Sequence, residues 1–272
     1  MNGKDLRYWQ ELESEIDQLE AKYGASRLLF RGVGDSSWTL ATTLERAGCQ
    51  SMSFLDYCHL IAFNIKPALE TFTEHEWSVP EMSTETQAQA SVFFLDRELL
   101  SLRKFPSQQL YSYLIYLRHH GFPSPLLDWS SSPFVAAFFA FRNRNTAERR
   151  SIYVYCEQPK GLKGGAVGEP TIRRIGPYVK AHPRHFRQQS DYTLCGTYDP
   201  NYGWRFHPHE PVFGGRGEQD LIWKYTLPSE ERSKVLGVLN YHNLNAYSLF
   251  DSEESLLETL WFKEHDLKRA RQ

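Results

Sequence analysis

The spacing of apolar side chains at the start of the chain predicts an amphipathic helix over residues 5–23. Apolar side chains recur there every three or four positions, at Leu6, Trp9, Leu12, Ile16, Leu19 and Tyr23. This spacing places them on one face of a helix. Gly24 follows at a position where helices commonly end. We therefore expect the helix to pack this face against the rest of the protein.

Five more segments have the periodicity and composition of helices, and three short β-rich segments are typical of strands. The predicted helices span residues 54–75, 87–103, 107–118, 230–239 and 255–268. The predicted strands span residues 27–30, 149–156 and 221–226. Pro67 interrupts the first of these helices, and Pro106 separates the second from the third, because proline lacks the backbone donor that a helix needs.

The order of these elements predicts a single α+β domain. Its N-terminal half is rich in helices, which we expect to pack on a mixed or antiparallel sheet. A chain of 272 residues is long enough to bury the core of such a domain. We place an N-terminal helix at residues 1–24, the main domain at residues 25–255 and a C-terminal helix at residues 256–272.

Composition and charge exclude several classes of protein. An apolar fraction of 41% and a net charge of −2 are typical of a soluble globular protein with no general attraction to nucleic acid or anionic membranes. No apolar run approaches the roughly 20 residues that span a bilayer, and the N-terminus lacks the apolar core of a signal peptide. Four widely spaced cysteines fit neither a zinc site nor a disulfide framework. We expect a cytoplasmic protein that does not bind membranes.

The pattern of regular elements breaks at residues 119–133, where titratable side chains stand among turn-forming residues. This segment contains two histidines, an aspartate, a tryptophan and four serines, together with one glycine and three prolines. The prolines exclude a helix interior, so we predict a loop, and loops held between regular elements often carry function. We expect Ser132 to cap a buried apolar helix that begins at Pro133.

A second candidate region lies where the strand predicted at residues 27–30 runs into Arg31, Gly32 and Gly34. A buried guanidinium is costly without an anionic partner, and its planar fork suits a phosphate or a carboxylate. The two glycines would let a ligand approach the backbone closely. The simpler interpretation pairs Arg31 with an internal carboxylate such as that of Asp128.

The segment at residues 119–133 offers several groups for chemistry. Asp128 is suited to act as a base, to orient His119, or to accept hydrogen bonds in a turn or cap. His119 and His120 are adjacent, so at most one of them faces a site. A hydrogen bond between His119 and Asp128 would support a hydrolase or a nuclease. The three serines at 130–132 suit a phosphate, a ribose or a helix cap.

Two later clusters carry charged groups, and several familiar motifs are missing. Residues 182–189 are basic and include Phe186, which fits contact with phosphate or RNA, or a solvated loop. Residues 216–220 include Glu218, whose carboxylate suits a general base or a turn cap. The sequence has no metal-ligand spacing, nucleophile elbow, P-loop or dinucleotide-binding fingerprint. We therefore expect no metal site, serine hydrolase, kinase or dehydrogenase.

These segments, in this order, resemble the FRG domain, a family named for an aromatic-Arg-Gly motif. Phe30, Arg31 and Gly32 match that motif, and residues 35–46 match the segment after it. Residues 119–130 resemble the central signature of the family, His-aromatic-Gly followed by Leu-Leu-Asp-Trp-Thr, and residues 132–140 continue it. The resemblance extends over roughly residues 25–255, with a later element that includes Arg184, Gln188, Tyr192 and Thr193. The sequence departs from the family pattern at His120, Pro125, Ser130 and Ser190, where Tyr, Arg, Thr and Gly are usual.

The FRG domain is in turn distantly similar to ADP-ribosyltransferases of the Arg-Ser-Glu class, which also begin with a strand that ends in aromatic-Arg-Gly. This similarity implies an ADP-ribosyltransferase-like fold with NAD as the substrate. Arg31 and Gly32 would bind the diphosphate of NAD, and Ser130 would bind the nicotinamide ribose. Gln188 or Glu218 would take the place of the catalytic glutamate.

The same similarity implies how the remaining groups would contribute. Trp38 or Trp129 would stack on a ring of NAD, and His119 and Asp128 would line the same site. The function it implies is an NAD-dependent ADP-ribosyltransferase that modifies an unknown protein or nucleic-acid acceptor. The alternative is a module without enzymatic activity that binds a nucleotide or RNA through Arg31, Arg184 and Arg187.

Overall fold

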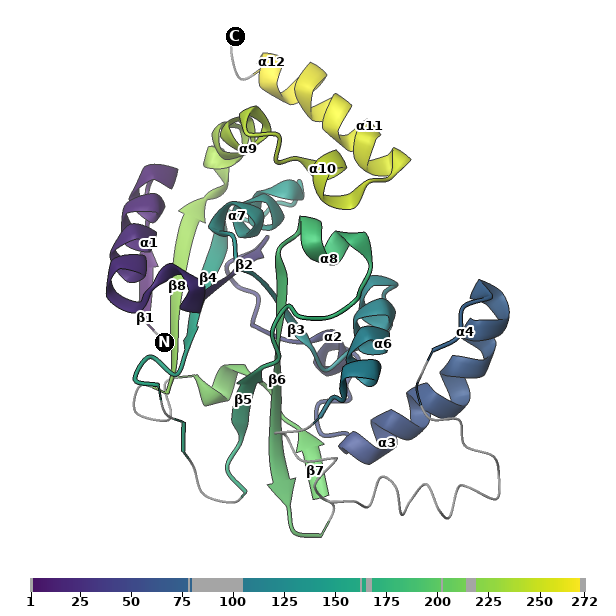
Figure 1. Cartoon of the computed structure of the whole chain (residues 1–272). Coiled ribbons are helices and arrows are strands. Elements are labelled where there is room, and N and C mark those ends of the chain that lie inside the picture. The colour runs from purple at the N-terminus through teal and green to yellow at the C-terminus, as the bar shows by residue number, and fades with distance from the viewer. Residues whose placement is uncertain are drawn as a thin grey trace.

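A computed structural model describes most of the chain as one sheet with helices packed on its faces (Figure 1). The residues that the structure describes are 2–77, 79, 105–161, 163–164, 168–201, 203–213 and 219–269. The helix predicted at 87–103 lies outside these residues.

The sheet has eight strands and is mixed, because its first strand is parallel to its neighbour and the other pairs are antiparallel. The strands are β1 (Asn2–Asp5), β2 (Leu28–Val33), β3 (Leu127–Ser130), β4 (Arg149–Glu157), β5 (Thr171–Arg174), β6 (Ser190–Asp199), β7 (Gly203–Phe206) and β8 (Asp220–Pro228). Their order is β1-β8-β4-β2-β3-β6-β5, and β7 pairs with β6. The predicted single α+β domain with a mixed sheet is confirmed.

Helices cover the sheet and extend beyond it. The α-helices are α1 (Trp9–Tyr23), α2 (Thr43–Arg46), α3 (Phe54–His59), α4 (Lys66–Thr73), α6 (Gln108–His119), α7 (Pro133–Arg142), α8 (Pro183–Arg187), α9 (Arg232–Tyr241), α10 (Ala246–Phe250), α11 (Glu253–Trp261) and α12 (Leu267–Arg269). π-Helical turns at Leu60–Ile65 and Phe262–Asp266 join α3 to α4 and α11 to α12. Short 3₁₀ turns occupy Ala25–Arg27, Glu210–Val212 and Ser229–Glu231.

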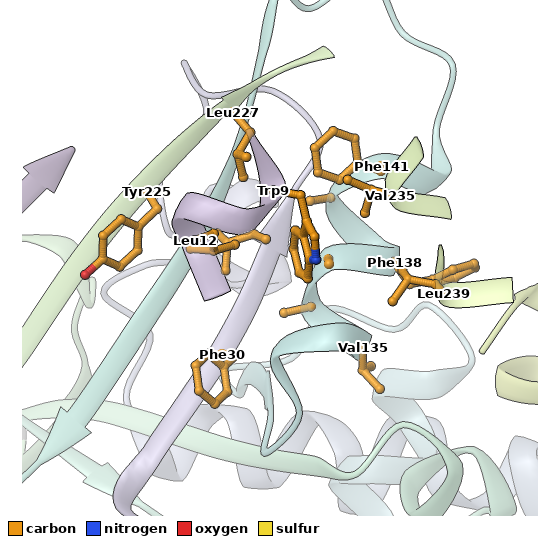
Figure 2. Packing of buried hydrophobic residues seen from close by; sticks show 14 of the residues in the cluster. Trp9, Leu12, Phe30, Val135, Phe138, Phe141, Tyr225, Leu227, Val235 and Leu239 are labelled. Atoms are coloured by element: carbon orange, nitrogen blue, oxygen red, sulfur yellow. The ribbon is translucent and has the colours of Figure 1, made fainter. Parts of the chain in front are cut away.

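The largest apolar cluster lies between the β8-β4-β2 half of the sheet and helices α1, α7 and α9 (Figure 2). Trp9 and Leu12 of α1 and Phe138 of α7 belong to this cluster. Helix α7 begins as predicted, because Ser132 accepts a hydrogen bond from the Val135 amide and Pro133 is the first helical residue. The helix packs directly on β2, and this contact fixes the strand that carries Arg31.

The two halves of the sheet share a second apolar cluster. Tyr155 of β4 stacks on Trp129 of β3, with ring centroids 5.3 Å apart. Leu29 of β2 and Cys195 of β6 belong to the same cluster. A third cluster packs α3 and α6 against β6. Residues from both halves of the sheet therefore meet around the junction of β2 and β3.

That junction is narrow. Strand β2 pairs with β4 from Leu28–Cys156 to Val33–Ser151, but it pairs with β3 only at Phe30 and Ser130. Beyond Phe30 the two strands diverge, and Arg31 is the first residue of β2 past the contact.

Sequence patterns predict most helices but fewer strands. Helices α1, α6, α9 and the two long helical segments at 54–73 and 253–269 confirm the predictions to within a few residues. The prediction that residues 119–133 form a loop is wrong in part, because β3 lies inside the segment. The predicted start of the first helix is also wrong, because residues 2–5 form β1 beside β8. The strand predicted at 27–30 continues to Val33, so Arg31 lies within a strand and not after its end.

Candidate functional site

A cleft of about 860 Å³ opens where β2 and β3 diverge. We call it the junction cleft. Its walls are formed by β2 and the loop at residues 37–41 that follows β2, by the end of α6, and by β3, α7, α8 and the start of β6. Ligand pockets commonly have volumes of roughly 300–1,000 Å³, so the cleft is large enough for a nucleotide.

Arg31 occupies the gap between the two strands. Its Nη1 donates a hydrogen bond to the main-chain carbonyl of Asp128 at 2.6 Å and lies 3.9 Å from the Asp128 carboxylate. The side chain thereby satisfies a carbonyl of β3 at the point where β2 has moved away. Its Nε is buried without a hydrogen-bond partner. Burial lowers the pKa of Arg31 to about 10, against the opposing charge of Asp128, so the group stays cationic at neutral pH.

Asp128 is held mainly by Arg118, the penultimate residue of α6. Nε of Arg118 donates to Oδ1 of Asp128 at 2.8 Å, and Nη2 binds Oδ2. Nη1 of Arg118 donates to Thr43 Oγ1 at 3.1 Å. Burial opposes ionisation of Asp128, but the charge and hydrogen bonds of Arg118 outweigh it and lower the pKa of the carboxyl group. Asp128 is thus the internal partner of two arginines, while Ser132 provides the helix cap.

The junction cleft carries an excess of positive charge although the whole chain has a net charge of −2. Four arginines line it: Arg31, Arg46, Arg118 and Arg184. Among the described lining residues Asp128 is the only acid. Each guanidinium has five donors in a fixed fork, and the described contacts engage only some of them. The cleft is therefore suited to an anionic ligand with more than one phosphate or carboxylate group.

His119 also lines the cleft, but it does not form a catalytic pair with Asp128. Its Nε2 lies 3.3 Å from the hydroxyl of Tyr192, and the Asp128 carboxylate is occupied by Arg118. Burial lowers the pKa of His119 to about 4, so the ring is neutral at pH 7. The hydrogen bond on which the hydrolase or nuclease interpretation depends is therefore missing. As expected for adjacent histidines, His120 is exposed and packs on Tyr116 instead.

Ser130 and Gln188 line the cleft, yet their polar groups are used within the protein. Ser130 Oγ donates to the Gln188 carbonyl at 2.8 Å and accepts from the Ser132 amide at 3.1 Å. The Gln188 side chain donates to the carbonyl of Leu249 at 3.3 Å. Both residues are buried. They join β3 to the turn before β6, and this arrangement does not present the Ser130 hydroxyl to a ribose.

The two candidate tryptophans have different environments. Trp38 lines the cleft and is 53% exposed, so a face of its indole is accessible. The Trp129 side chain is only 3% exposed, because it stacks on Tyr155 and donates its indole N–H to Thr193. This burial does not fit the expectation that Trp129 stacks on a ring of the ligand. Trp38 is the remaining candidate for that contact.

Gly32 packs against a helix and leaves no room for a side chain. A Cβ on Gly32 would lie 1.8 Å from the Ala136 carbonyl oxygen, so Gly32 lacks a side chain because α7 packs on it. The glycine does line the cleft, but helix packing is what excludes a side chain at this position. Glu218 lies outside the described residues, and its predicted catalytic role stays a prediction.

The two arginines of α8 also have different environments. Arg184 lines the cleft, where its Nε donates to the Phe250 carbonyl at 3.3 Å. Arg187 forms an ion pair with Asp251 at 2.7 Å and is not a lining residue. Of the three arginines expected to bind a nucleotide or RNA, only Arg31 and Arg184 line the cleft.

Sequence reasoning missed several lining residues. Arg46 stands in the motif segment at residues 35–46, but nothing in its spacing indicates that it faces Arg31. Arg118 precedes His119 and lies ten positions before Asp128, a separation that no local pattern connects. Its position at the end of a predicted helix, beside a polar segment, is the signal that was available. Phe139 was predicted only as part of a buried apolar helix, and no local pattern places Phe250 in the cleft.

The described residues contain no metal-binding cluster and no membrane-spanning helix. They contain no group of three or more side chains placed to bind a metal ion. Within the same residues, no helix has both the length and the apolar character needed to traverse a bilayer.

The segment that builds this cleft matches a known protein family. Residues 26–149 match the family model described as the FRG domain. The chain contains an FRG domain. The match includes Arg31, Arg118 and Asp128, whereas Arg184 and Gln188 lie after its end. No curated protein and no solved structure was found to match the chain. The FRG domain therefore supplies both sides of the β2–β3 junction, and the similarity to ADP-ribosyltransferases stays a prediction.

Proposed function

We propose that this FRG-domain protein is an NAD-dependent ADP-ribosyltransferase and that the junction cleft binds NAD. The observation that carries the proposal is the charge of the cleft, where four arginines face a single described carboxylate. The diphosphate of a dinucleotide loses its contacts with water on binding, and positively charged donors must replace them. Such an arrangement of arginines supplies those donors. The aromatic-Arg-Gly resemblance points to NAD among the dinucleotides.

Arg31 is the arginine best placed to bind the diphosphate. The described contacts of its two terminal nitrogens engage only Nη1, with Asp128, and the side chain is 17% exposed, which leaves Nη2 to donate to a ligand. Arg118 is committed to Asp128, so it acts indirectly by neutralising that carboxylate. In the proposal Arg31 binds the diphosphate, with Arg46 and Arg184 as further contacts on the walls.

The rings of NAD require apolar or aromatic surface. The exposed indole of Trp38 offers one such surface at the edge of the cleft. Phe139 and Phe250 offer a second on the walls from α7 and α10. A cationic centre between two aromatic surfaces fits a dinucleotide better than a mononucleotide.

Transfer would break the bond between C1′ of the ribose and the nicotinamide nitrogen, and nicotinamide would leave with the bonding electrons. The oxocarbenium ion at C1′ would then be attacked by a nucleophile of the acceptor, which loses a proton. A carboxylate near C1′ would stabilise the developing positive charge. Asp128 is the described candidate for this role, and Glu218 remains the candidate from the sequence.

Release of nicotinamide by the purified protein tests the proposal. Wild type should release nicotinamide from NAD, and Arg31→Ala should reduce the rate at least tenfold because one charged contact to the diphosphate is lost. Asp128→Asn and Glu218→Gln identify the carboxylate, since only one of them should abolish release while NAD still binds. Arg7→Ala, at an exposed arginine before α1, is the matched control. Absence of release from wild type, with and without cell extract as a source of acceptor, would refute transferase activity.

One observation favours a second candidate, a module that binds a nucleotide or RNA without catalysis. The only described carboxylate in the cleft is held by Arg118 in a two-point contact, and this pairing reduces its capacity to stabilise a cation. This candidate predicts saturable nucleotide binding that depends on Arg31, with no release of nicotinamide. RNA binding in this mode would weaken with added salt, and Arg184→Ala would reduce it.

A further inference from the structure

Helix α11 turns its apolar face away from the protein. Ser255 and Thr259 are buried at 2% and 5% exposure, whereas Leu257 is 66% and Trp261 56% exposed. Leu256 and Leu260 are exposed on the same helix. A surface helix of a globular protein normally has the opposite arrangement, with its apolar stripe facing the core. In Figure 1, α11 lies at the outer edge of the molecule, beyond α9 and α10.

Hydrogen bonds hold the polar side chains of α11 inside and so fix the orientation of the helix. Thr259 Oγ1 accepts from the Tyr247 amide at 2.9 Å and donates to the Ser255 carbonyl at 2.9 Å. Ser255 Oγ donates to the Ser252 carbonyl at 2.7 Å, within a reciprocal cap of the helix. Rotation of α11 to bury the leucines would break the bond between the Tyr247 amide of α10 and Thr259, and would leave a partly buried donor without a partner, which is costly. The apolar face is therefore a stable feature of the surface.

Charges flank this apolar face unequally. Glu253 and Glu254 are exposed at the start of α11. Lys268 and Arg269 are exposed in α12, and Lys268 pairs with Glu264 one turn before it. The helical segment from 253 to 269 thus has an acidic beginning, an apolar middle and an end of net positive charge, where Lys263, Lys268 and Arg269 outnumber Glu264 and Asp266.

We propose that this segment is the interface of a homodimer, in which α11 and α12 of two copies pack side by side and antiparallel. A two-fold axis through the apolar middle brings Leu257, Leu260 and Trp261 of the two copies together. The same axis places the acidic beginning of each helix beside the basic end of the other. A parallel pair would instead place like charges together.

The charges also decide against other occupants of this face. An interfacial membrane helix usually carries lysine and arginine on its polar side and is attracted to anionic lipids. Glu253 and Glu254 would be repelled by such a surface and equally by nucleic acid. The same segment of a second copy of the chain complements this face. Its apolar middle can cover the leucines, and its charges of both signs can meet charges of the opposite sign. The proposal does not depend on what the junction cleft binds.

The size of the protein in solution, measured by light scattering over a dilution series, tests the interface. Wild type should have twice the chain mass at high concentration, and Leu257→Arg should have the mass of one chain. Leu257 is so exposed that its replacement leaves the folded monomer intact. Phe72→Arg, at a side chain of α4 that is 87% exposed, is the control and should leave the dimer unchanged. A wild type that stays monomeric at the highest concentration reached would overturn the proposal.

Charge reversal tests the antiparallel arrangement. Glu253→Lys with Glu254→Lys should weaken the dimer roughly tenfold, because two sets of like charges then meet. Lys268→Glu with Arg269→Glu should weaken it to a similar degree. All four changes in one chain should restore the wild-type dissociation constant, which local loss of helix stability would not do. Failure of this rescue, or dimers that are insensitive to both reversals, would contradict the antiparallel interface.

Discussion

Strand β2 has a neighbour on each side, and the two neighbours differ. β4 pairs with it along its whole length, from Leu28–Cys156 to Val33–Ser151, whereas β3 pairs with it only at Phe30 and Ser130. On the β4 side the backbone groups are satisfied within the sheet. On the β3 side the strands separate, and the side chain of Arg31 donates to a carbonyl that strand pairing leaves open.

The difference teaches where charge can be placed in this fold. Along the continuous ladder of β4 the buried side chains are mainly apolar or aromatic, and the one buried guanidinium, that of Arg150, donates to the Ala140 carbonyl of α7. Where the ladder stops, a guanidinium can enter between the strands and replace the missing hydrogen bond. The same opening admits Asp128, Arg118 and a ligand. The well-paired side holds the strand in place, and the open side holds the candidate site.

The largest effect is expected from a methyl group on the packed face of β2. In Gly32→Ala the new Cβ would lie 1.8 Å from the Ala136 carbonyl oxygen and 2.6 Å from the Ala140 amide nitrogen, so α7 must move. We expect a loss of about 3 kcal/mol or more in the free energy of unfolding, measured by denaturant titration. Gly34→Ala is the matched control, because its Cβ has no neighbour closer than 3.5 Å. Equal stabilities of the two variants would contradict the packing described.

A smaller loss in the free energy of unfolding is expected when one charge of the Arg118–Asp128 pair in the cleft is removed. Arg118→Met removes the two-point contact to Asp128 and the bond to Thr43. Asp128 is partly exposed, so we expect a loss of about 2 kcal/mol, less than for a fully buried pair. The double variant Arg118→Met with Asp128→Asn should recover part of it. If the two losses simply add, the residues are not coupled.

A third effect depends on pH. The pKa of His119 in the folded protein, about 4, is below the ordinary value near 6.5, so the unfolded chain binds the proton more readily. The free energy of unfolding should therefore fall as the pH is lowered from about 6.5 to 4, by on the order of 1–2 kcal/mol from this group. His119→Gln should flatten this part of the stability profile. His242→Gln, at an exposed histidine, should not, and identical profiles for wild type and His119→Gln would refute the assignment.

The smallest effect concerns the edge of the cleft. Trp38→Ala removes the exposed aromatic surface and should weaken NAD binding by about fivefold, or about 1 kcal/mol, with no change in stability. Tyr241→Ala, at an exposed ring on α9, serves as the control in the same titration. Unchanged affinity for Trp38→Ala would place the rings of the ligand elsewhere.

Local patterns predict the helices of this protein better than its strands. The spacing of apolar residues in α1 and the Ser132–Pro133 start of α7 have direct physical signatures, and both predictions are confirmed. β1 is fully exposed and exists because it pairs with β8, a contact more than 200 positions away that no local pattern encodes. β3 did have a signal, since buried Leu127 and Trp129 alternate with the polar Asp128 and Ser130, but the surrounding prolines obscured it.

The candidate site could be predicted only in part for the same reason. Arg31, Asp128 and His119 stand out as charged or titratable residues beside apolar runs, and all three line the cleft. The ribose role of Ser130 stays a prediction, and in the structure the hydroxyl donates to the Gln188 carbonyl, because a hydroxyl beside a strand end is readily used by the chain itself. Arg118 and Arg46 reach the cleft from helices that fold over the sheet, so their role emerges only from tertiary structure.

The proposed function depends on the binding of NAD by Arg31 at the open side of β2. Calorimetric titration of NAD into the purified protein, beside Arg31→Ala and Arg7→Ala, tests this binding most directly. We predict saturable binding by wild type and Arg7→Ala, and an affinity at least tenfold weaker for Arg31→Ala. No binding by wild type at millimolar NAD, or equal binding by Arg31→Ala, would contradict it.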